Sequence, residues 1–392
     1  MLVTIFIDAI GFGLIIPVLP RLLMAVGGFG LGDAVRVAAW MGLAIAVASF
    51  FSAPVLGNLS DRFGRRPVLL IALSGLALDY LLLAVANTLP LIVLGRVLSG
   101  AFGGSYAPAQ AAIADVTVPE QRARNFGFVS AAFGVGFVLG PAIGGLLGQL
   151  GERAPFYVAS GLAALNVAYG LTVFPETLPA GRRRPFAWRR ANPLGALAAI
   201  RAAPGMAPAV AVLVLWQIAS LVYPLTWSFY AIARFGWPDW MIGASLAAVG
   251  VVIAFSQTLL TGRIVRRFGE RDAATIGLVC ATAGFLAYGV ATTTWMAYAA
   301  MVFIAGQSFV QPSLMAILSR RATAETQGEV QGIAAMALGL GSIIAPLVLT
   351  RTLAGFVRPG ASLWMTGSAF LVAAGFALAA LLLLRRLPRV TV

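Results

Sequence analysis

Twelve apolar segments of about 20 or more residues dominate this chain of 392 residues. A helix needs about 20 mostly apolar residues to cross the hydrocarbon core of a bilayer. The chain therefore predicts an all-α membrane protein with 12 transmembrane helices. The first is expected to be a retained span and not a signal peptide, because it lacks a basic leader. The expected spans are roughly 2–26, 35–56, 67–86, 89–114, 125–150, 154–174, 205–233, 239–262, 273–292, 295–318, 328–355 and 361–384.

The composition excludes several other classes of protein. The chain is 60% hydrophobic and 10% charged, whereas soluble domains are about 45–50% apolar and about 25% charged. A water-soluble enzyme is therefore excluded. The single cysteine, Cys280, and the absence of histidine exclude a disulfide framework and a metal site built on cysteine or histidine. No metal is expected.

All 27 basic residues are arginines, and their distribution predicts the orientation of the chain. Twenty lie in the loops and tail on one side of the predicted spans, and six lie on the opposite side. By the positive-inside rule, both termini are expected in the cytoplasm. Topology thus explains the net charge of +14. We expect a cytoplasmic (inner) membrane protein with lipid neighbours and no nucleic-acid partner.

The longest connection, about 175–204, divides the predicted spans six and six. It contains Arg182-Arg183-Arg184 and several prolines, which is typical of a cytoplasmic linker. The predicted domains are therefore an N-terminal six-helix bundle at 1–174, the linker at 175–204, and a C-terminal bundle at 205–392. A solvated linker is the simpler interpretation, and contact of Phe186 and Trp188 with the lipid surface is the alternative.

A shift of 205 residues superimposes the two halves of the chain. Segment 57–66 falls on segment 262–271, and the same register still holds where Pro141 meets Pro346. Two like-oriented halves of six helices are the parallel-repeat plan of many secondary transporters. In that plan the substrate binds near the midplane between the halves, and rocking of one half gives alternating access.

The charges inside the spans break this repeat. Three charged residues of the first half have uncharged partners in the second half: Asp8, Asp79 and Arg96 fall on Leu213, Gly284 and Met301. A charged carboxylate is costly in hydrocarbon, so it can exchange a proton when its surroundings change. The first half is therefore expected to carry the proton coupling, with Asp8, Asp79 and Arg96 as its residues. A purely structural ion pair with Arg96 is the alternative.

Several segments resemble one family of transporters. Segment 57–66 matches the Gly-x-Leu-x-Asp-Arg-x-Gly-Arg-Arg loop of the major facilitator superfamily. Segment 136–145 resembles the antiporter motif in span five of its proton-coupled drug exporters, and segment 8–20 resembles their first span. Similarity to tetracycline efflux proteins lies in segments 78–84, 95–100 and 327–332. The resemblance covers essentially the whole chain and implies two pseudo-symmetric six-helix bundles and drug:proton antiport.

The resemblance also implies two functional motifs. The loop of segment 57–66 would act as a latch on the cytoplasmic side, with Gly57 and Gly64 permitting a tight turn and Asp61 accepting N–H groups from a facing helix. Charge that only sets topology is the alternative. The gating residues are Gly57, Asp61, Arg62, Gly64, Arg65, Arg66, Asp115 and Arg122, with Glu120 and Arg124 nearby. The antiporter-motif residues are Gly136, Gly140, Pro141, Gly144 and Gly145.

The second half offers amide and aromatic groups as a substrate lining. The predicted lining residues are Gln217, Tyr223, Trp227, Gln257, Gln307 and Gln311. Helix packing is the alternative role for any one of them. Tetracycline exporters carry an acidic residue in span nine and a histidine in span eight, where this chain has Ala281 and Ile253. A broader, more lipophilic substrate range than tetracycline is therefore predicted.

Taken together, these patterns predict proton-coupled export of hydrophobic or amphipathic drugs. The chain has no lysine and no Gly-Lys-Ser/Thr loop, so the proton gradient and not ATP is expected to drive transport, without a cofactor. A proton-coupled importer of a nutrient and a flippase for lipids or other amphiphiles are the alternatives. An enzyme is disfavoured because the sequence offers no nucleophile–base pair. We expect a monomer that binds small amphipathic or aromatic substrates and protons.

Overall fold

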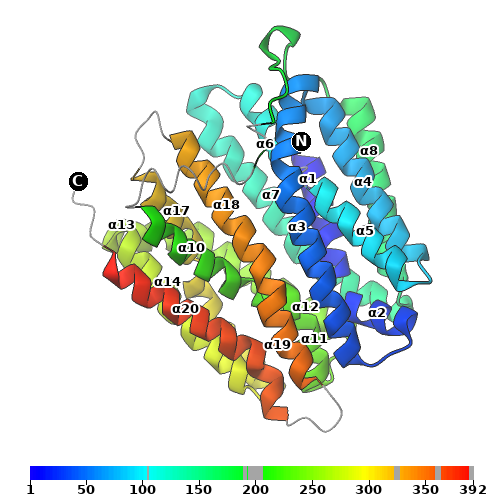
Figure 1. Cartoon of the computed structure of the whole chain (residues 1–392), viewed down its shortest axis with the longest axis vertical. Coiled ribbons are helices and arrows are strands. Elements are labelled where there is room, and N and C mark those ends of the chain that lie inside the picture. The colour runs from blue at the N-terminus through cyan, green and yellow to red at the C-terminus, as the bar shows by residue number, and fades with distance from the viewer. Residues whose placement is uncertain (104–105, 189–191, 193–205, 322–326, 358–362, 388–392) are drawn as a thin grey trace. The chain divides into compact units, whose positions relative to one another are not determined.

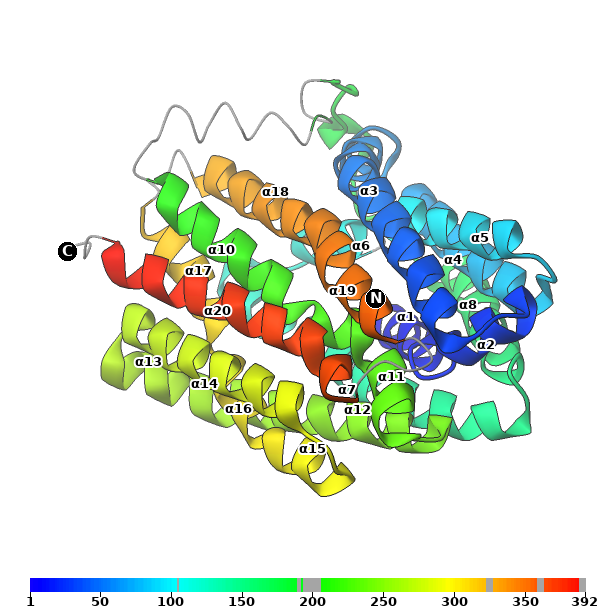
Figure 2. The same ribbon diagram turned by 60° about the horizontal axis from the view of Figure 1, so that its bottom comes forward.

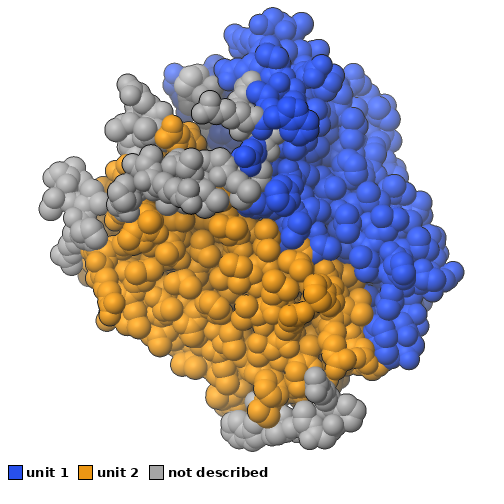
Figure 3. Space-filling model, viewed as in Figure 1, with its two compact units in different colours: residues 1–29, 44–193, 238–250 blue, residues 30–43, 194–237, 251–392 orange. Residues whose placement is uncertain are grey.

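The computed structural model describes residues 1–103, 106–188, 192, 206–321, 327–357 and 363–387. Its regular secondary structure in these residues is helical throughout, which confirms the predicted all-α fold class (Figure 1). The chain forms two units (Figure 3). Unit 1 comprises residues 1–29, 44–193 and 238–250, and unit 2 comprises residues 30–43, 194–237 and 251–392. The predicted domains, at 1–174 and 205–392 with a linker between them, divide the chain by its sequence repeat. They stay a prediction.

Unit 1 is built around two packed helix groups. Its helices are α1 (Leu2–Ile15), α2 (Leu19–Gly27), α3 (Leu31–Phe63) from residue 44 onward, α4 (Arg65–Val85), α5 (Leu89–Phe102), α6 (Tyr106–Asp115), α7 (Arg122–Leu147), α8 (Ala154–Val173) and the first part of α12 (Asp239–Phe255). Helix α1 packs against α7 and α8, and α4 packs against α5 and α8. Helix α8 therefore joins the two groups.

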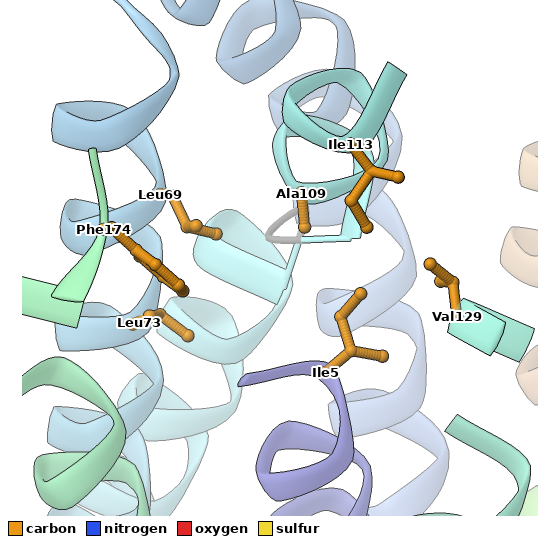
Figure 4. Close-up of a cluster of buried hydrophobic side chains, with 7 residues drawn as sticks. All are labelled: Ile5, Leu69, Leu73, Ala109, Ile113, Val129 and Phe174. Carbon is orange, nitrogen blue, oxygen red and sulfur yellow. The ribbon is translucent and has the colours of Figure 1, made fainter. Parts of the chain in front are cut away.

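One apolar cluster ties these helices together (Figure 4). Its buried members are Ile5, Leu69, Leu73, Ala109, Ile113, Val129 and Phe174. They come from α1, α4, α6, α7 and the residue that follows α8. Such contacts between helices far apart in sequence hold the unit in one arrangement.

The first predicted span is broken. The sequence predicts one span over 2–26, whereas α1 and α2 form a pair bent by 51°. Pro17 lies at the break. Proline lacks an N–H group and its ring clashes with the carbonyl group four residues earlier, so it interrupts a helix.

Unit 2 has a similar plan. Its helices are the start of α3, α10 (Ala207–Ser220), α11 (Val222–Phe235), the rest of α12, α13 (Gly262–Phe268), α14 (Glu270–Val290), α15 (Thr294–Ala300), α16 (Val302–Gln307), α17 (Val310–Ser319), α18 (Gln327–Ala345), α19 (Arg351–Phe356) and α20 (Ser368–Arg386). Helix α20 packs against both α10 and α14, as both views indicate (Figures 1 and 2).

Two spans of unit 2 contain wider helical turns. The segment Ser256–Thr261 joins α12 to α13 as a π-helix, and Pro346–Thr350 joins α18 to α19 in the same form. Proline at the start of the second segment removes one N–H donor, which accounts for the local change in hydrogen bonding. The sequence predicts continuous helices at both places.

The helices support the predicted spans. Among the described residues, ten helices are long and apolar enough to cross a membrane, and the bent pair α1–α2 makes an eleventh candidate. Helix α5 is a shorter apolar helix at the start of the predicted fourth span. That span continues in α6, and residues 104 and 105 between them lie outside the described residues.

The repeat register reappears in the backbone. Helix α4 covers residues 65–85, and α14 covers 270–290, which is the same helix shifted by 205 residues. Gly64 before α4 has φ 107° and ψ 162°, and Gly269 before α14 has φ 80° and ψ 166°. Both conformations favour glycine, because a Cβ atom is strained at such positive φ values.

Candidate functional site

A buried ion pair joins α4 and α5 of unit 1. Asp79 of α4 is 0% exposed and Arg96 of α5 is 5% exposed. The Arg96 guanidinium donates to both carboxylate oxygens of Asp79, with its Nε 3.2 Å from Oδ1. Ser99, one turn further along α5, also donates to this carboxylate. A two-pronged pair of this kind fixes both side chains and neutralises both charges within the helix bundle.

Glycine allows α5 to approach the pair. A Cβ atom on Gly95 would lie 3.0 Å from Oδ1 of Asp79 and 3.4 Å from its backbone oxygen. The close contact between α4 and α5 thus places Arg96 directly against Asp79. The sequence predicts both residues as charged groups inside spans, and the structure brings them together.

The second carboxylate, Asp8, lies on α1 and meets α8. Asn166 of α8 is fully buried, and its Nδ2 donates to Oδ1 of Asp8 over 3.1 Å. The same Nδ2 donates to the backbone oxygen of Thr4 over 3.1 Å. Asp8 itself is half-buried. The sequence analysis does not single out Asn166, although an amide in an apolar span is a signal for such a role.

Tyr80, the residue after Asp79 on α4, interacts with both carboxylates. Its side chain is 4% exposed, and its hydroxyl interacts electrostatically with Asp79, Asp8 and Arg96. Gly11 of α1 leaves room for the ring, because a Cβ atom there would lie 3.1 Å from Cε2 and 3.5 Å from the hydroxyl oxygen of Tyr80. The predicted proton-coupling residues Asp8, Asp79 and Arg96 therefore share one electrostatic environment.

The equivalent positions in unit 2 carry no charge. Gly284 replaces Asp79, and a Cβ atom on it would lie 2.8 Å from Cβ of Phe303. Met301 replaces Arg96 and is buried. Helix α14 instead contributes Phe285 and Tyr288 to a cluster of aromatic rings. The cluster members are Tyr223, Trp227, Tyr230, Phe285, Tyr288 and Phe370, whose ring centroids lie 4.9–6.3 Å from those of their neighbours.

The predicted substrate-lining residues have different surroundings. Trp227 is 1% exposed within the aromatic cluster, a position that suits packing. Tyr223 is half-buried, and its hydroxyl accepts from Nε2 of Gln307 over 3.2 Å. Gln217 donates to Ser342 over 3.2 Å, Gln311 accepts from Nε1 of Trp216 over 3.2 Å, and Gln257 is exposed in the π-helical segment. Their role in substrate binding stays a prediction.

The predicted gating loop forms a charged network in unit 1. Arg65 donates to Asp61 over 2.7 Å, to Asp115 over 3.1 Å and to Ser60 over 3.1 Å. Arg62 lies over the ring of Phe63. The structure thus links α3, α4 and α6 at one end of the unit through Arg65.

Two details of the loop differ from the predictions. Gly57 lies within α3, where a Cβ atom would meet nothing within 4 Å, so it is not part of a tight turn. Only Gly64 of the two has the positive φ that a turn of this kind requires. The side chain of Arg122 lies outside the described residues, as do segments 189–191 and 193–205 of the predicted linker.

An acidic residue that the sequence analysis did not identify caps α4. Glu176 accepts from the backbone N–H of Arg65 over 2.8 Å and of Arg66 over 3.3 Å. A carboxylate at a helix N-terminus satisfies unpaired N–H donors and complements the helix dipole. On the same helix end, Arg66 donates to the backbone oxygen of Leu171 over 2.6 Å.

The first part of the predicted linker is docked on this loop. Asn58 donates to the backbone oxygen of Ala187 over 2.7 Å and accepts from the N–H of the same residue over 3.4 Å. The backbone N–H of Arg184 donates to the backbone oxygen of Asp61 over 3.0 Å. This part of the linker is therefore held against α3 while residues 179–185 stay exposed, and the solvated linker stays a prediction. Trp188 is 78% exposed, and its contact with lipid stays a prediction.

The antiporter-motif residues form close helix contacts within unit 1. A Cβ atom on Gly136 would lie 2.6 Å from the backbone oxygen of Phe6, and one on Gly140 would lie 2.7 Å from Cα of Gly13. Gly144 also approaches α1, at the backbone of Leu14. Pro141 and Gly145 face α12: the carbonyl of Pro141 touches Gly243, and Gly145 would place a Cβ atom 2.5 Å from the backbone oxygen of Asp239.

An ion pair fixes the start of α12 beside α7, at the glycine-lined contact that we call the helix seam. Arg21 of α2 donates from Nε to Oδ1 of Asp239 over 2.6 Å, and Asp239 is 5% exposed. A Cβ atom on Gly148 would lie 2.9 Å from Oδ2 of the same carboxylate. Glycines on and just after α7 therefore allow both α1 and α12 to pack closely against it.

The arrangement has the chemistry of a transporter. It offers helices that could span a bilayer, paired charges within them and a glycine-lined helix seam. The sequence pattern of the Major Facilitator Superfamily matches residues 1–346. The chain belongs to the Major Facilitator Superfamily and is a multi-span membrane transporter, not an enzyme.

Curated relatives refine this assignment. The chain is 39% identical over 384 residues to "Tetracycline resistance protein, class C" of Escherichia coli, covering 98% of this chain and 95% of the relative. It is 35% identical to the class E protein of the same organism, covering 98% and 93%. "Multidrug resistance protein 2" of Bacillus subtilis (strain 168) is 27% identical, covering 88% and 86%. The chain is thus related to tetracycline-resistance efflux proteins.

Solved structures share the fold. The human organic anion transporter MFSD10 (TETRAN) matches with a TM-score of 0.72 and 24% identity, covering 98% of this chain and 97% of that one. The nucleoside transporter NupG matches with a TM-score of 0.77 and 15% identity, covering 98% and 97%. At these identities the likeness concerns the fold alone.

Proposed function

We propose that this protein exports hydrophobic or amphipathic compounds in exchange for protons by alternating access. The observation that carries the proposal is the buried Asp79–Arg96 pair, which lies inside two predicted spans. A carboxylate buried beside a permanently charged guanidinium can change its protonation state when a conformational change separates the two. The names of the sequence relatives support the export of drugs.

The proposed energy source is the proton gradient of the bacterial cytoplasmic membrane. The family consists of secondary transporters, which agrees with a mechanism that needs neither ATP nor a cofactor. Asp8, Asp79 and Arg96 would carry the coupling, and the amide and aromatic groups of unit 2 would contact the substrate. We propose that both termini lie in the cytoplasm, because the arginines gather on one side of the predicted spans. We further propose a monomer as the working unit.

The test uses purified protein in proteoliposomes with an imposed pH gradient and a fluorescent lipophilic cation as the substrate. Antiport predicts that substrate moves against the direction of proton flow. Substrate that enters the lumen should therefore make the lumen more alkaline, and substrate that leaves it should make the lumen more acidic. Movement of substrate together with protons would favour a nutrient importer. Transfer of labelled lipid between leaflets without any effect of the pH gradient would favour a flippase.

The substrate range is the finer part of the proposal. Ala281 in α14 is fully buried, and Ile253 in α12 is half-buried, so neither position supplies the acid or the histidine of tetracycline exporters. Aromatic and amide groups can shelter apolar rings but cannot neutralise a second charge. Expression in a pump-deficient bacterium should raise resistance to lipophilic dyes and leave tetracycline resistance low. A large rise in tetracycline resistance alone would contradict this.

A further inference from the structure

One buried polar group in unit 1 is only half used. Asn166 is 0% exposed, and its Nδ2 makes both of the hydrogen bonds described above, to Asp8 and to the backbone oxygen of Thr4. Its other polar atom, Oδ1, is buried and has no hydrogen-bond partner among the described residues. Buried amide oxygens are nearly always satisfied, so an idle acceptor beside a carboxylate needs an explanation.

The chemistry of a carboxyl group supplies one. A charged carboxylate only accepts hydrogen bonds, whereas a protonated carboxyl group gains one O–H donor. The Nδ2–H of Asn166 already donates to Oδ1 of Asp8. When a proton arrives on Oδ2 of Asp8, the new O–H group can donate to Oδ1 of Asn166. The acid and the amide then form a closed pair with two hydrogen bonds.

We propose that Asn166 is the positioning residue of Asp8, holding its carboxyl group in both the charged and the protonated state. This inference rests on the proposed proton coupling. Asn166 donates to the charged form through Nδ2 and accepts from the protonated form through Oδ1. The proton can therefore bind and leave while the side chain of Asp8 stays against α8.

The titratable and charged groups around Asp8 come from its own helix and from the helices packed against it. Helix α1 packs against α7 and α8, and residues 125–147 of α7 contain no titratable side chain. The titratable side chains of α8 are Tyr157 and Tyr169. From α4, Asp8 interacts electrostatically with Tyr80, beyond which lies the neutralised Asp79–Arg96 pair. The amino group of Met1 begins α1 two turns earlier.

The repeat supports a role in proton chemistry. At the shift of 205 residues, Asp8 falls on Leu213 and Asn166 falls on Leu371. The acid and the amide are thus both absent from the equivalent positions of the second half. The amide therefore occurs in the half that carries the acid it contacts.

The decisive measurement is an infrared pH titration of the carboxyl band of Asp8 in proteoliposomes, with the band assigned by its loss in Asp8→Asn. Asn166→Leu removes both hydrogen bonds at a similar side-chain size, and Asn166→Ala removes them with a smaller side chain and adds no new charge. Because the bond to the charged form is the stronger one, both variants should move the midpoint to higher pH by about one unit, a tenfold change in proton affinity. The frequency of the protonated band should also change.

A matched control separates positioning from packing. Ser160 lies on the same helix and donates to the backbone oxygen of Ala77 over 3.4 Å, away from Asp8. Ser160→Ala should leave the midpoint and the band frequency unchanged. If Asn166→Leu does not fold, Asn166→Ala still decides the question. Wild-type midpoint and frequency in either Asn166 variant would overturn the proposal and leave Asn166 with a role in helix packing alone.

Failure of this inference and failure of the proposed function can be told apart. The infrared titration needs no transport, so an Asn166-dependent midpoint would stand even if wild-type protein showed no export driven by a pH gradient. That second result would contradict the proposed function alone. If export is observed, its pH profile should shift in both Asn166 variants, whereas a merely structural loss would lower the rate equally at every pH.

Discussion

Helices α4 and α14 are the same element with opposite chemistry. Each has 21 residues, each begins after a glycine of positive φ, and each is followed by an alanine with ψ near 130°. At equivalent places, however, α4 carries Asp79 and α14 carries Gly284. The comparison teaches that backbone conformation and apolar packing set the shared helices and turns of the repeat, which we call its frame. Single positions on these helices can therefore differ in chemistry and take different functions.

Arginine contacts near the ends of α4 and α14 show the same pattern of a shared frame with different details. Arg66 donates to the last turn of α8, and its repeat partner Arg271 donates to the backbone oxygens of Leu384 and Arg385 at the end of α20. At the opposite end, Arg153 donates to the backbone oxygen of Ala86 over 2.7 Å. In the second half, the repeat partner of Ala86 is Ala291. Its backbone oxygen accepts over 2.7 Å from Arg234 of α11, which is not the repeat partner of Arg153.

The largest effect should follow from breaking the buried Asp79–Arg96 pair, whose equivalent positions in the second half carry no charge. Asp79→Asn should reduce export driven by a pH gradient to the level of protein-free liposomes, because the group that takes up the proton beside Arg96 is lost. The change also leaves a buried arginine without its counter-charge, which costs about 3–5 kcal/mol of stability. Substrate binding should persist. The measurements are proteoliposome flux, thermal unfolding and ligand binding.

A second variant separates stability from coupling. In Asp79→Asn/Arg96→Gln, the uncompensated charge is gone, so much of the stability should return while export stays absent. Export at the wild-type rate in either variant would show that the pair serves only to hold α4 against α5. The charge difference between the halves would then have no part in coupling.

The sequence predicts the charge pair and the repeat but not how the residues between them are used. Long apolar runs and the fixed offset of 205 residues predict the helices, since both signals extend over many residues. Asp79 and Arg96 stand out because charge is rare within spans. The break at Pro17 and the π-helical segments are not predicted, since membrane helices tolerate proline and a hydropathy pattern does not report local hydrogen bonding.

Single polar residues are the harder part of the site. Asn166, Glu176 and Asn58 act through contacts with residues more than 100 positions away, and no local pattern reports such distances. Trp227 shows the opposite difficulty. Its helical spacing with Gln217 and Tyr223 suggests a cavity, but rings from α14 and α20 surround it, and these are visible only after the helices are packed.

A medium effect should come from the two glycines that begin the equivalent helices. Gly64→Ala places a Cβ atom at φ 107° and against the Glu176 carboxylate that caps α4. Gly269→Ala has the same kind of strain at φ 80°, but its Cβ atom meets nothing within 4 Å. Strain at such φ values costs about 1–3 kcal/mol. The first variant should therefore lower the unfolding temperature in detergent more than the second.

This pair of variants measures how differently the halves use one backbone turn. Equal losses of stability would mean that Glu176 moves aside without cost, and that its cap on α4 contributes little. As a control, Glu176→Gln removes the charge of the cap without adding a Cβ atom. It should lower stability by about 0.3–1 kcal/mol, the usual contribution of a charge at a helix N-terminus.

The smallest effect concerns charges that are reversed between the halves. The cytoplasmic network of the first half consists of Asp61, Arg65 and Asp115, and the same positions in the second half hold Arg266, Glu270 and Arg320. The ion pair survives the reversal, because Arg65 contacts Asp115 over 3.1 Å and Arg320 contacts Glu270 over 2.7 Å. Pairing is therefore a shared feature of the frame, and polarity is what differs.

Reversing the polarity of the first half tests whether that difference matters. The triple variant Asp61→Arg/Arg65→Glu/Asp115→Arg keeps opposite charges in contact, so its unfolding temperature should stay near that of the wild type. Its turnover should still fall, because a guanidinium cannot accept the helix N–H groups that a latch at Asp61 requires. Partly exposed pairs contribute about 0.2–1 kcal/mol, so the loss should be about two- to fivefold in proteoliposome turnover with substrate binding unchanged.

Arg65→Glu alone brings three carboxylates together and should lower both stability and turnover, which controls for pairing. Full turnover in the triple variant would instead mean that the loop needs only local ion pairs, and that the negative charge of Asp61 has no partner of its own.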